Sequence, residues 1–393
     1  MENAGLRHCG AIFAAILLAL AAVQTAPANA AVGATVVIDM QNGRVLSHEN
    51  AFQRWYPASL TKIMTAYVAF RAIKAGRLTL NSPVRVSKHA AGEPPSKMGY
   101  KPGSEMTLDN ALKMLIVKSA NDIAMAIAES VGGSQAKFAD MMNAEARRLG
   151  MTGTNYVNPN GLHDTRQYTT ARDLAILSAA VRREFPEHEH YFGLEGITAG
   201  KKLLRSYNIL LGRFPGADGM KTGFVCASGF NLVGSATRGG RTLIAVVLGA
   251  TSQEERAEAA AELLAEGFKK HSNAGIRISD FAAYGASRNE APNLRSAICT
   301  KQAQAERWDG RDDEGRMVIR SRYLTPMTRE PRTVAVGLGG AVGPSPEFFA
   351  NVPIPTPRPD FEPQELALQP PVEPEALIRT GIPVPTPRPT AVR

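Results

Sequence analysis

Two strand hairpins that lie far apart in the sequence enclose a mostly helical segment. The first pairs residues 34–39 with 44–47 around Gln-Asn-Gly, and the second pairs residues 230–237 with 242–249 around Arg-Gly-Gly-Arg. Glycine and asparagine between short apolar runs are a strong hairpin signal, because they tolerate the backbone angles of a tight turn. The simplest closure places both hairpins in one antiparallel sheet.

The segment between and after the hairpins has helical patterning. Proline at position 57 suits a first helical turn, and glycine follows two of the expected helices as a terminator. A Thr-Ala-Arg-Asp sequence resembles a capping box, and the last helix has acidic residues early and lysines late, as its dipole favours. We predict helices over residues 57–75, 107–117, 122–131, 135–149, 170–183 and 254–271. The expected fold is α+β, with a helical lobe against the sheet and a cleft between the two.

The first 30 residues have the layout of a secretory signal peptide. A weakly basic start precedes an apolar run at residues 11–23, and small residues before Ala31 provide a cleavage site. The apolar run is short for a transmembrane helix, and an uncleaved N-terminal anchor is the alternative interpretation. We expect residues 1–30 to direct secretion across the inner membrane, to the periplasm or cell envelope.

The remainder divides into a patterned body at residues 31–275 and a weakly patterned C-terminal part. Residues 276–340 form either a small module or a poorly ordered stretch, with 317–320 and 333–336 as candidate strands.

Proline dominates the C-terminal residues 341–393, which hold more than half of the chain's 26 prolines. The sequence Val-Pro-Ile-Pro-Thr-Pro-Arg-Pro at 352–359 recurs, with two substitutions, at 382–389. A stretch of this composition is expected to be extended or disordered. It serves either as a spacer or as a docking peptide for a partner that the sequence does not identify.

Charge and cysteine content narrow the classes of function. The net charge of +9 is spread along the chain without a Lys/Arg block, which argues against nucleic acid and favours weak attraction to anionic wall polymer or lipid head groups. Cys226 and Cys299 can pair in an oxidising compartment, but we predict that they do not, because Cys299 lies in a polar region; Cys226 is expected to pack as a small hydrophobe. No motif implies a metal or an organic cofactor.

Three short motifs occur in order along the chain. They are Ser59-Leu-Thr-Lys62, Ser119-Ala-Asn121 and Lys221-Thr-Gly223. Each is weak alone, since decoys of every one occur elsewhere in the sequence. The ordered set is specific, because its members fall at a helix start, between two helices and at the opening of the late strands.

These residue types suit nucleophilic catalysis. A serine hydroxyl is a poor nucleophile until a base removes its proton, and residues three apart project from one helix face, so Lys62 can reach Ser59. Lysine is a base only when its pKa falls, through burial or through a second ammonium group such as that of Lys221. Ser119 and Asn121 would then bridge the two lysines and the substrate.

The sequence around these motifs resembles the low-molecular-mass penicillin-binding proteins, which are serine-type D-alanyl-D-alanine carboxypeptidases (peptidase S11 type). Ser-x-x-Lys, followed by Ser-Asp-Asn and Lys-Thr-Gly, is the known signature of penicillin-binding proteins and class A β-lactamases. The resemblance covers roughly residues 31–272, and its longer stretches are residues 57–64, 119–122, 158–162, 168–174 and 219–223.

The resemblance implies a β-lactamase/transpeptidase-like α+β fold and a set of residue roles. Ser59 would be the acylated nucleophile and Lys62 the general base, with Ser119, Asn121 and Lys221 in proton relay and positioning. The backbone N–H groups of Ser59 and Phe224 would form the oxyanion hole. Thr222 and Arg256 would hold the terminal carboxylate of the substrate, and the implied substrate-binding residues are Thr222, Gly223, Phe224 and Arg256.

The implied substrate is the peptidoglycan stem peptide, from which the enzyme would remove the terminal D-alanine. β-Lactams would acylate the same serine, because their strained amide resembles the D-Ala-D-Ala junction. Ala120 replaces the glycine that is usual in this family, and the proline-rich end differs from the family's usual C-terminal membrane helix and second β-rich domain.

Three other functions are compatible with these motifs. An endopeptidase would cut D-alanyl cross-links with the same residues. A β-lactamase would need a glutamate that activates water for deacylation, and no E-x-x-L-N element follows Asn121. A non-catalytic wall-binding protein would keep the cleft and work through its proline-rich tail.

Overall fold

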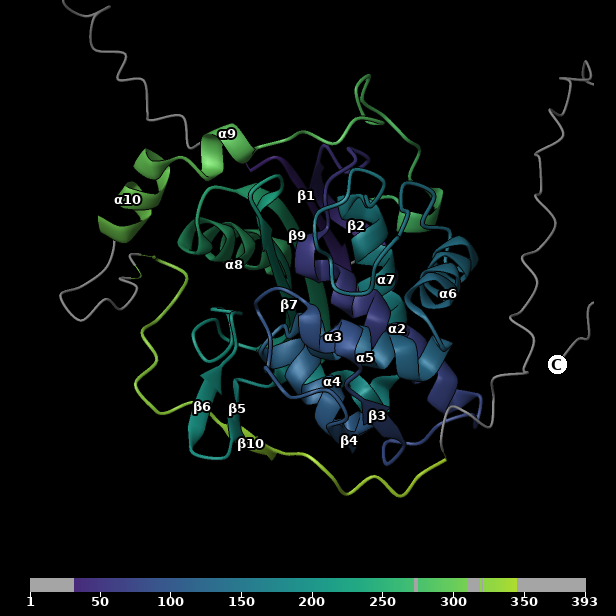
Figure 1. Cartoon of the computed structure of the whole chain (residues 1–393). Coiled ribbons are helices and arrows are strands. Elements are labelled where there is room, and N and C mark those ends of the chain that lie inside the picture. Colours follow the sequence, from purple (N-terminus) through teal and green to yellow (C-terminus); the bar gives the residue numbers. More distant parts are fainter. Residues whose placement is uncertain (1–31, 272–274, 310–318, 320, 345–393) are drawn as a thin grey trace, which may run out of the picture. The chain divides into compact units, whose positions relative to one another are not determined.

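A five-stranded antiparallel sheet forms the centre of the structure (Figure 1). The computed structural model describes residues 32–271, 275–309, 319 and 321–344. The strand order is β2-β1-β9-β8-β7, with bounds β1 Ala34–Asp39, β2 Arg44–Glu49, β7 Ala217–Val225, β8 Gly229–Arg238 and β9 Arg241–Ala250. The predicted pairing of the first hairpin with the late strands is confirmed, because β1 pairs with β9.

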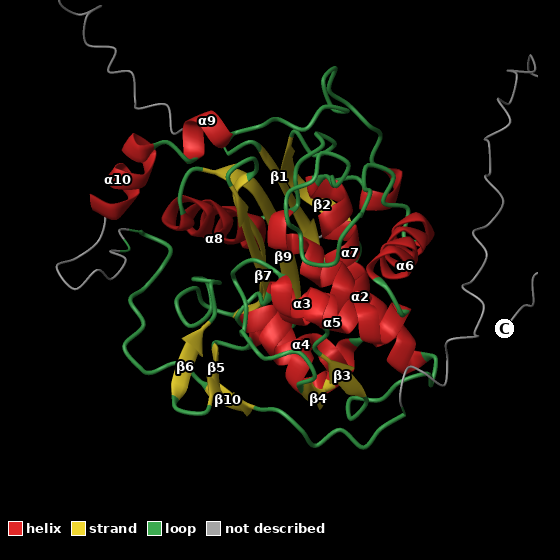
Figure 2. Ribbon diagram, in the orientation of Figure 1, coloured by secondary structure: helices red, strands yellow, loops and turns green. Residues whose placement is uncertain are grey.

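Helices cover the two faces of this sheet (Figure 2). Helix α8 (Gln253–Lys269) packs on β8 and β9, and α7 (Ala171–Glu184) packs on β1 and β9. Beyond α7 lies the helical lobe, in which α2 contacts α4, α5 and α6; it also contacts α7. Its members are α2 Thr61–Lys74, α3 Lys88–Gly92, α4 Leu108–Val117, α5 Asn121–Gly132 and α6 Gln135–Arg148.

Side-chain caps explain where several of these helices begin. The hydroxyl of Thr170 accepts a hydrogen bond from Asp173 N, as the capping-box pattern predicts. Thr107, Ser134 and Ser252 cap α4, α6 and α8 in the same way. The six predicted helices are confirmed to within a few residues, except that the first begins as a short 3-10 turn, η1 (Ala58–Leu60).

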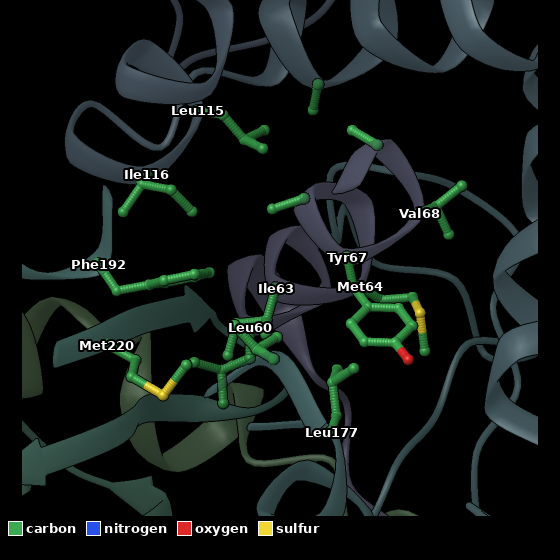
Figure 3. Packing of buried hydrophobic residues seen from close by; sticks show 14 of the residues in the cluster. Leu60, Ile63, Met64, Tyr67, Val68, Leu115, Ile116, Leu177, Phe192 and Met220 are labelled. Carbon is green, nitrogen blue, oxygen red and sulfur yellow. The ribbon is translucent and has the colours of Figure 1, made fainter. Parts of the chain in front are cut away.

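Helix α2 is buried along nearly its whole length, so it anchors the lobe to the sheet. Figure 3 shows Leu60 and Ile63 on the side that faces Met220 of β7, and Tyr67 on the side of Leu177. These side chains belong to one apolar cluster that joins helices and sheet. Burial of each such side chain contributes roughly 2 kcal/mol, which fixes α2, and the residues at its start, against β7.

Short elements complete the fold. Strands β3 (Pro83–Arg85) and β4 (Glu105–Thr107) pair with each other, and β10 (Thr333–Val336), β5 (Gly196–Ala199) and β6 (Lys202–Arg205) form a three-stranded sheet. The candidate strand at 333–336 is therefore confirmed, whereas most of the one at 317–320 lies outside the described residues. The remaining elements are η2 Pro186–Gly193, η3 Ile278–Asp280, α9 Arg295–Ile298 and α10 Lys301–Asp309.

The segment after the body packs back onto it and corrects the prediction for the cysteines. Cys226 and Cys299 form a disulfide bond. The expectation that they stay apart was wrong because α9 is not a free polar stretch. Leu294 and Ile298, four residues apart, pack against Phe230 and the neighbouring part of the sheet, and this contact brings Cys299 to the end of β7.

The predicted signal peptide and nearly all of the proline-rich tail lie outside the described residues. Within the part of the chain that the structure describes, no helix combines the length and apolar character needed to cross a bilayer.

Candidate active site

Ser59 lies in η1, where the start of the long helix meets the edge strand β7. The residue before it, Ala58, has a φ of 48°, a strained conformation for a residue with a Cβ. Two glycines allow this close packing. A Cβ on Gly161 would lie 1.8 Å from the carbonyl oxygen of Ala58, and a Cβ on Gly223 would lie 3.1 Å from Ser59 N. Only glycine at these two positions therefore lets the loop at Gly161 and strand β7 approach Ser59.

Lys62 is completely buried and makes three hydrogen bonds. Its Nζ lies 3.0 Å from Ser59 Oγ, 2.8 Å from Asn121 Oδ1 and 2.5 Å from the backbone carbonyl oxygen of Asn160. A neutral amine has two hydrogens and one lone pair. Because Asn121 and Asn160 offer only acceptors here, they can take both hydrogens and leave the lone pair for the Ser59 hydroxyl.

Burial lowers the pKa of Lys62 to about 7, whereas the nearby carboxylates of Glu93 and Asp122 act in the opposite direction. Burial also lowers the pKa of Lys221 far below its usual value, and the charges of Lys62 and Arg256 lower it further. The two ammonium groups repel each other, whereas the carboxylates near Lys62 favour its charged form. Burial is the largest cause of the lowered pKa of Lys62.

Ser119 and Lys221 form a second bonded pair. Lys221 Nζ donates to Ser119 Oγ at 3.0 Å and to the carbonyl oxygen of Thr222 at 2.9 Å. Ser119 has a φ of 57°, which turns the chain sharply between α4 and α5. The next helix then begins at Asn121, so that its side chain reaches Lys62.

The residues implied for substrate binding are also near the serine. Thr222 and Gly223 lie on β7 beside η1, while Phe224 is 40% exposed and stacks on Phe230.

The guanidinium group of Arg256 is buried behind the strand, where it donates to the carbonyl oxygens of Gly223, Asn231 and Tyr207. Arg256 thus supports the backbone of the site, and its contact with a substrate carboxylate remains a prediction.

Two residues beside Lys62 were not singled out from the sequence. Asn160 supplies the carbonyl oxygen that accepts from Lys62, and its side-chain Nδ2 donates to Glu93 Oε2 at 3.0 Å. The stretch 158–162 resembles the family, but the sequence alone assigns it no role. Nothing in the local pattern around Glu93 marks it as different from a surface acid.

Across the described ranges, no group of three or more His, Cys, Asp or Glu side chains is arranged to hold a metal ion.

A sheet edge that presents Lys-Thr-Gly beside a half-buried serine and a buried lysine combines the motifs that mark the penicillin-binding proteins, and solved structures of that class share the fold. The D-alanyl-D-alanine carboxypeptidase DacD from Francisella tularensis is 33% identical, with a TM-score of 0.58 over 61% of this chain and 71% of that chain. Penicillin-binding protein D2 from Listeria monocytogenes, solved in a cefotaxime-bound form, is 30% identical with a TM-score of 0.55, over 60% and 97% of the two chains.

The chain belongs to the D-alanyl-D-alanine carboxypeptidase family (peptidase S11), whose sequence profile matches residues 21–252. The D-alanyl-D-alanine carboxypeptidase DacC of Escherichia coli K12 is 38% identical over 265 residues, which is 64% of this chain. The alignment covers 65% of that relative, so the chain spans slightly less than two thirds of its length.

Proposed function

We propose that this protein is a serine D-alanyl-D-alanine carboxypeptidase that removes the terminal D-alanine from peptidoglycan stem pentapeptides. The observation that carries the proposal is the buried Lys62 amine. It is bonded to Ser59 Oγ, and its two other partners are acceptors. That arrangement suits a neutral general base beside a serine nucleophile.

In the acylation step, Lys62 Nζ takes the Ser59 proton while Oγ attacks the carbonyl carbon of the penultimate D-alanine. The N–H groups of Ser59 and Phe224 stabilise the oxyanion. The C–N bond then breaks as Ser119, bonded to Lys221, passes its hydroxyl proton to the leaving amine. The Lys62 ammonium group restores a proton to Ser119 and becomes neutral again. Thr222 and Arg256 bind the carboxylate of the terminal residue.

In the deacylation step, water attacks the Ser59 ester. Lys62 takes a proton from the water and returns it to Ser59 Oγ as the ester C–O bond breaks, and the shortened stem peptide leaves as a free carboxylic acid. The strained amide of a β-lactam enters at the acylation step and leaves a covalent ester on the same serine. The cefotaxime-bound relative is consistent with this part of the proposal.

The first experiment is gel detection of a fluorescent penicillin on the purified protein and on a Ser59→Ala variant. Wild-type protein should carry the label and the variant should not, because the variant has no hydroxyl to acylate. Equal labelling of the two proteins would end the assignment of Ser59. Release of D-alanine from a pentapeptide, compared with cleavage of a cross-linked dimer, then separates the carboxypeptidase from an endopeptidase.

The proposed location is the periplasm or cell envelope, after removal of residues 1–30. The substrate is made of cell-wall material, and the relatives that the chain matches are bacterial D-alanyl-D-alanine carboxypeptidases. Mass analysis of the protein recovered from a periplasmic extract would test this, since a chain that starts at Ala31 is the expected species.

A further inference from the structure

Glu93 is a buried carboxyl group that the steps proposed above do not use. It follows α3, and only 8% of the residue is exposed. Its Oε2 accepts a hydrogen bond from Asn160 Nδ2 at 3.0 Å, and the backbone carbonyl of the same Asn160 accepts from Lys62 Nζ. A single residue therefore connects this carboxyl group to the proposed base.

The orientation of Asn160 is fixed at both ends of its side chain. Its Oδ1 accepts from Leu162 N at 3.0 Å, which leaves Nδ2 as the donor to Glu93. The preceding residue is held to α2, because Thr65 Oγ1 donates to the carbonyl oxygen of Pro159 at 2.6 Å. The bond to Glu93 is thus one of the contacts that hold the Asn160 carbonyl in place above Lys62.

Several charged groups on neighbouring elements lie near Lys62 and Glu93. Asp122 at the start of α5, Lys221 on β7 and Glu93 face Lys62, and His89 on α3 faces Glu93. The carboxylate of Asp122 is already committed, because it accepts backbone N–H groups of Met98, Gly99 and Ile123.

Burial raises the pKa of Glu93, whereas the positive charges of His89 and Lys62 act in the opposite direction. A negative charge on Glu93 favours the protonated form of Lys62, which is inactive as a base. Glu93 therefore acts on Lys62 in two ways: by position, through Asn160, and by charge.

We propose that Glu93 is a positioning residue for acyl transfer, which fixes the carbonyl group that receives a Lys62 hydrogen and sets the lowest pH at which Lys62 works as a base. The inference rests on the proposed function of Ser59 and Lys62. It adds a third member to the set of groups that determine when the serine is activated.

The test measures the rate constant of penicillin acylation from about pH 5.5 to about pH 9.5. The proteins are wild type, Glu93→Gln, Glu93→Ala and Glu266→Gln. Glutamine keeps an acceptor for Asn160 and removes the charge, whereas alanine removes both. Glu266, which pairs with Lys269 on the exposed part of α8, is a control for the loss of one negative charge far from the site.

Removal of an anion beside a cation makes the cation easier to deprotonate. In Glu93→Gln, the midpoint of the acidic limb should therefore move down by about one pH unit, with a plateau rate near that of wild type. In Glu93→Ala, the plateau rate should fall roughly tenfold or more, because Asn160 loses its anchor. Glu266→Gln should match wild type throughout.

An unchanged midpoint in Glu93→Gln would overturn the inference. So would a uniform loss of rate at every pH in that variant, which a purely structural residue would produce. These results are distinct from a failure of the proposed function, in which wild-type protein itself would not be acylated at Ser59.

Discussion

The side chain of Lys62 is shielded from water, and this burial is what makes its amine a usable base. Its side chain is fully buried, and its pKa is lowered to about 7 chiefly by that burial. An ordinary lysine is protonated at neutral pH and has no lone pair to offer. The same burial opposes folding, because the unfolded chain can hold the ammonium group in water and the folded chain cannot.

This opposition predicts how stability depends on pH. The folded-state pKa of Lys62 lies below its unfolded value, so between them the unfolded chain binds more protons and the free energy of unfolding rises with pH. From about pH 7 to about pH 9, Lys62 alone should add roughly 2 kcal/mol. Urea unfolding of wild type and Lys62→Met at several pH values measures the difference, since the variant should lose this part of the slope.

Lys62→Met should also have a higher free energy of unfolding than wild type at pH 7, because methionine fills the space without a buried amine, and it should not be acylated. Equal pH slopes in the two proteins would show that the buried amine is not what opposes folding.

An element could be predicted from the sequence when the residues that determine it lie close together along the chain. The hairpins, the helix caps and the Ser59–Lys62 spacing are set by residues close together in sequence. Strands β3 to β6 are only three or four residues long and show no usable periodicity. Asn160 lies 98 positions from Lys62, and no local pattern predicts a backbone carbonyl as a lysine partner. The residues around Cys299 in the sequence are mostly polar, and this hides the packing of Leu294 and Ile298 that holds α9 against the sheet.

Gly161 packs directly against the turn η1, in space that the Cβ of any other residue would occupy. In Gly161→Ala, the methyl group would overlap the Ala58 carbonyl, and the positive φ of 86° would add backbone strain. We expect penicillin acylation to fall at least tenfold, since a small misplacement of a nucleophile has effects on the order of 100-fold. Stopped-flow acylation kinetics, with circular dichroism to confirm folding, measure the effect.

Gly133→Ala is the matched control for that substitution. Gly133 has a φ of 77° and open space where a Cβ would lie. It should lose about 1 kcal/mol of stability from backbone strain and keep its acylation rate. If both variants lost acylation equally, strain in general, and not the contact with Ala58, would be the cause.

The folded body extends beyond α8, the last helix that the sequence predicts. Residues 275–309 return along the sheet, where Val45 N donates to the Ile276 carbonyl, Gly43 O accepts from Ile278 N, and Leu294 N donates to the Ala227 carbonyl. The disulfide then joins this segment to the end of β7, the strand that carries Lys221. The segment buries Ile278 and Ile298 and packs Phe281, Tyr284 and Leu294 against the body, and the disulfide adds a covalent link to these contacts.

Loss of that link should destabilise the protein without removing the proposed catalytic groups. The bond closes a loop of 73 residues, and loops of this size lose about 2–4 kcal/mol when opened. Cys226→Ser, Cys299→Ser and the double variant should all lose similar stability, because each removes the same bond. Acylation of the folded variants should stay within about twofold of wild type, since the hydrogen bonds that hold Lys62 and Lys221 are made to other residues. Denaturant unfolding with and without reductant measures this: reductant should weaken wild type and leave the double variant unchanged. Additive losses in the two single variants, or peptides of Cys226 and Cys299 that separate without reduction, would contradict the bond.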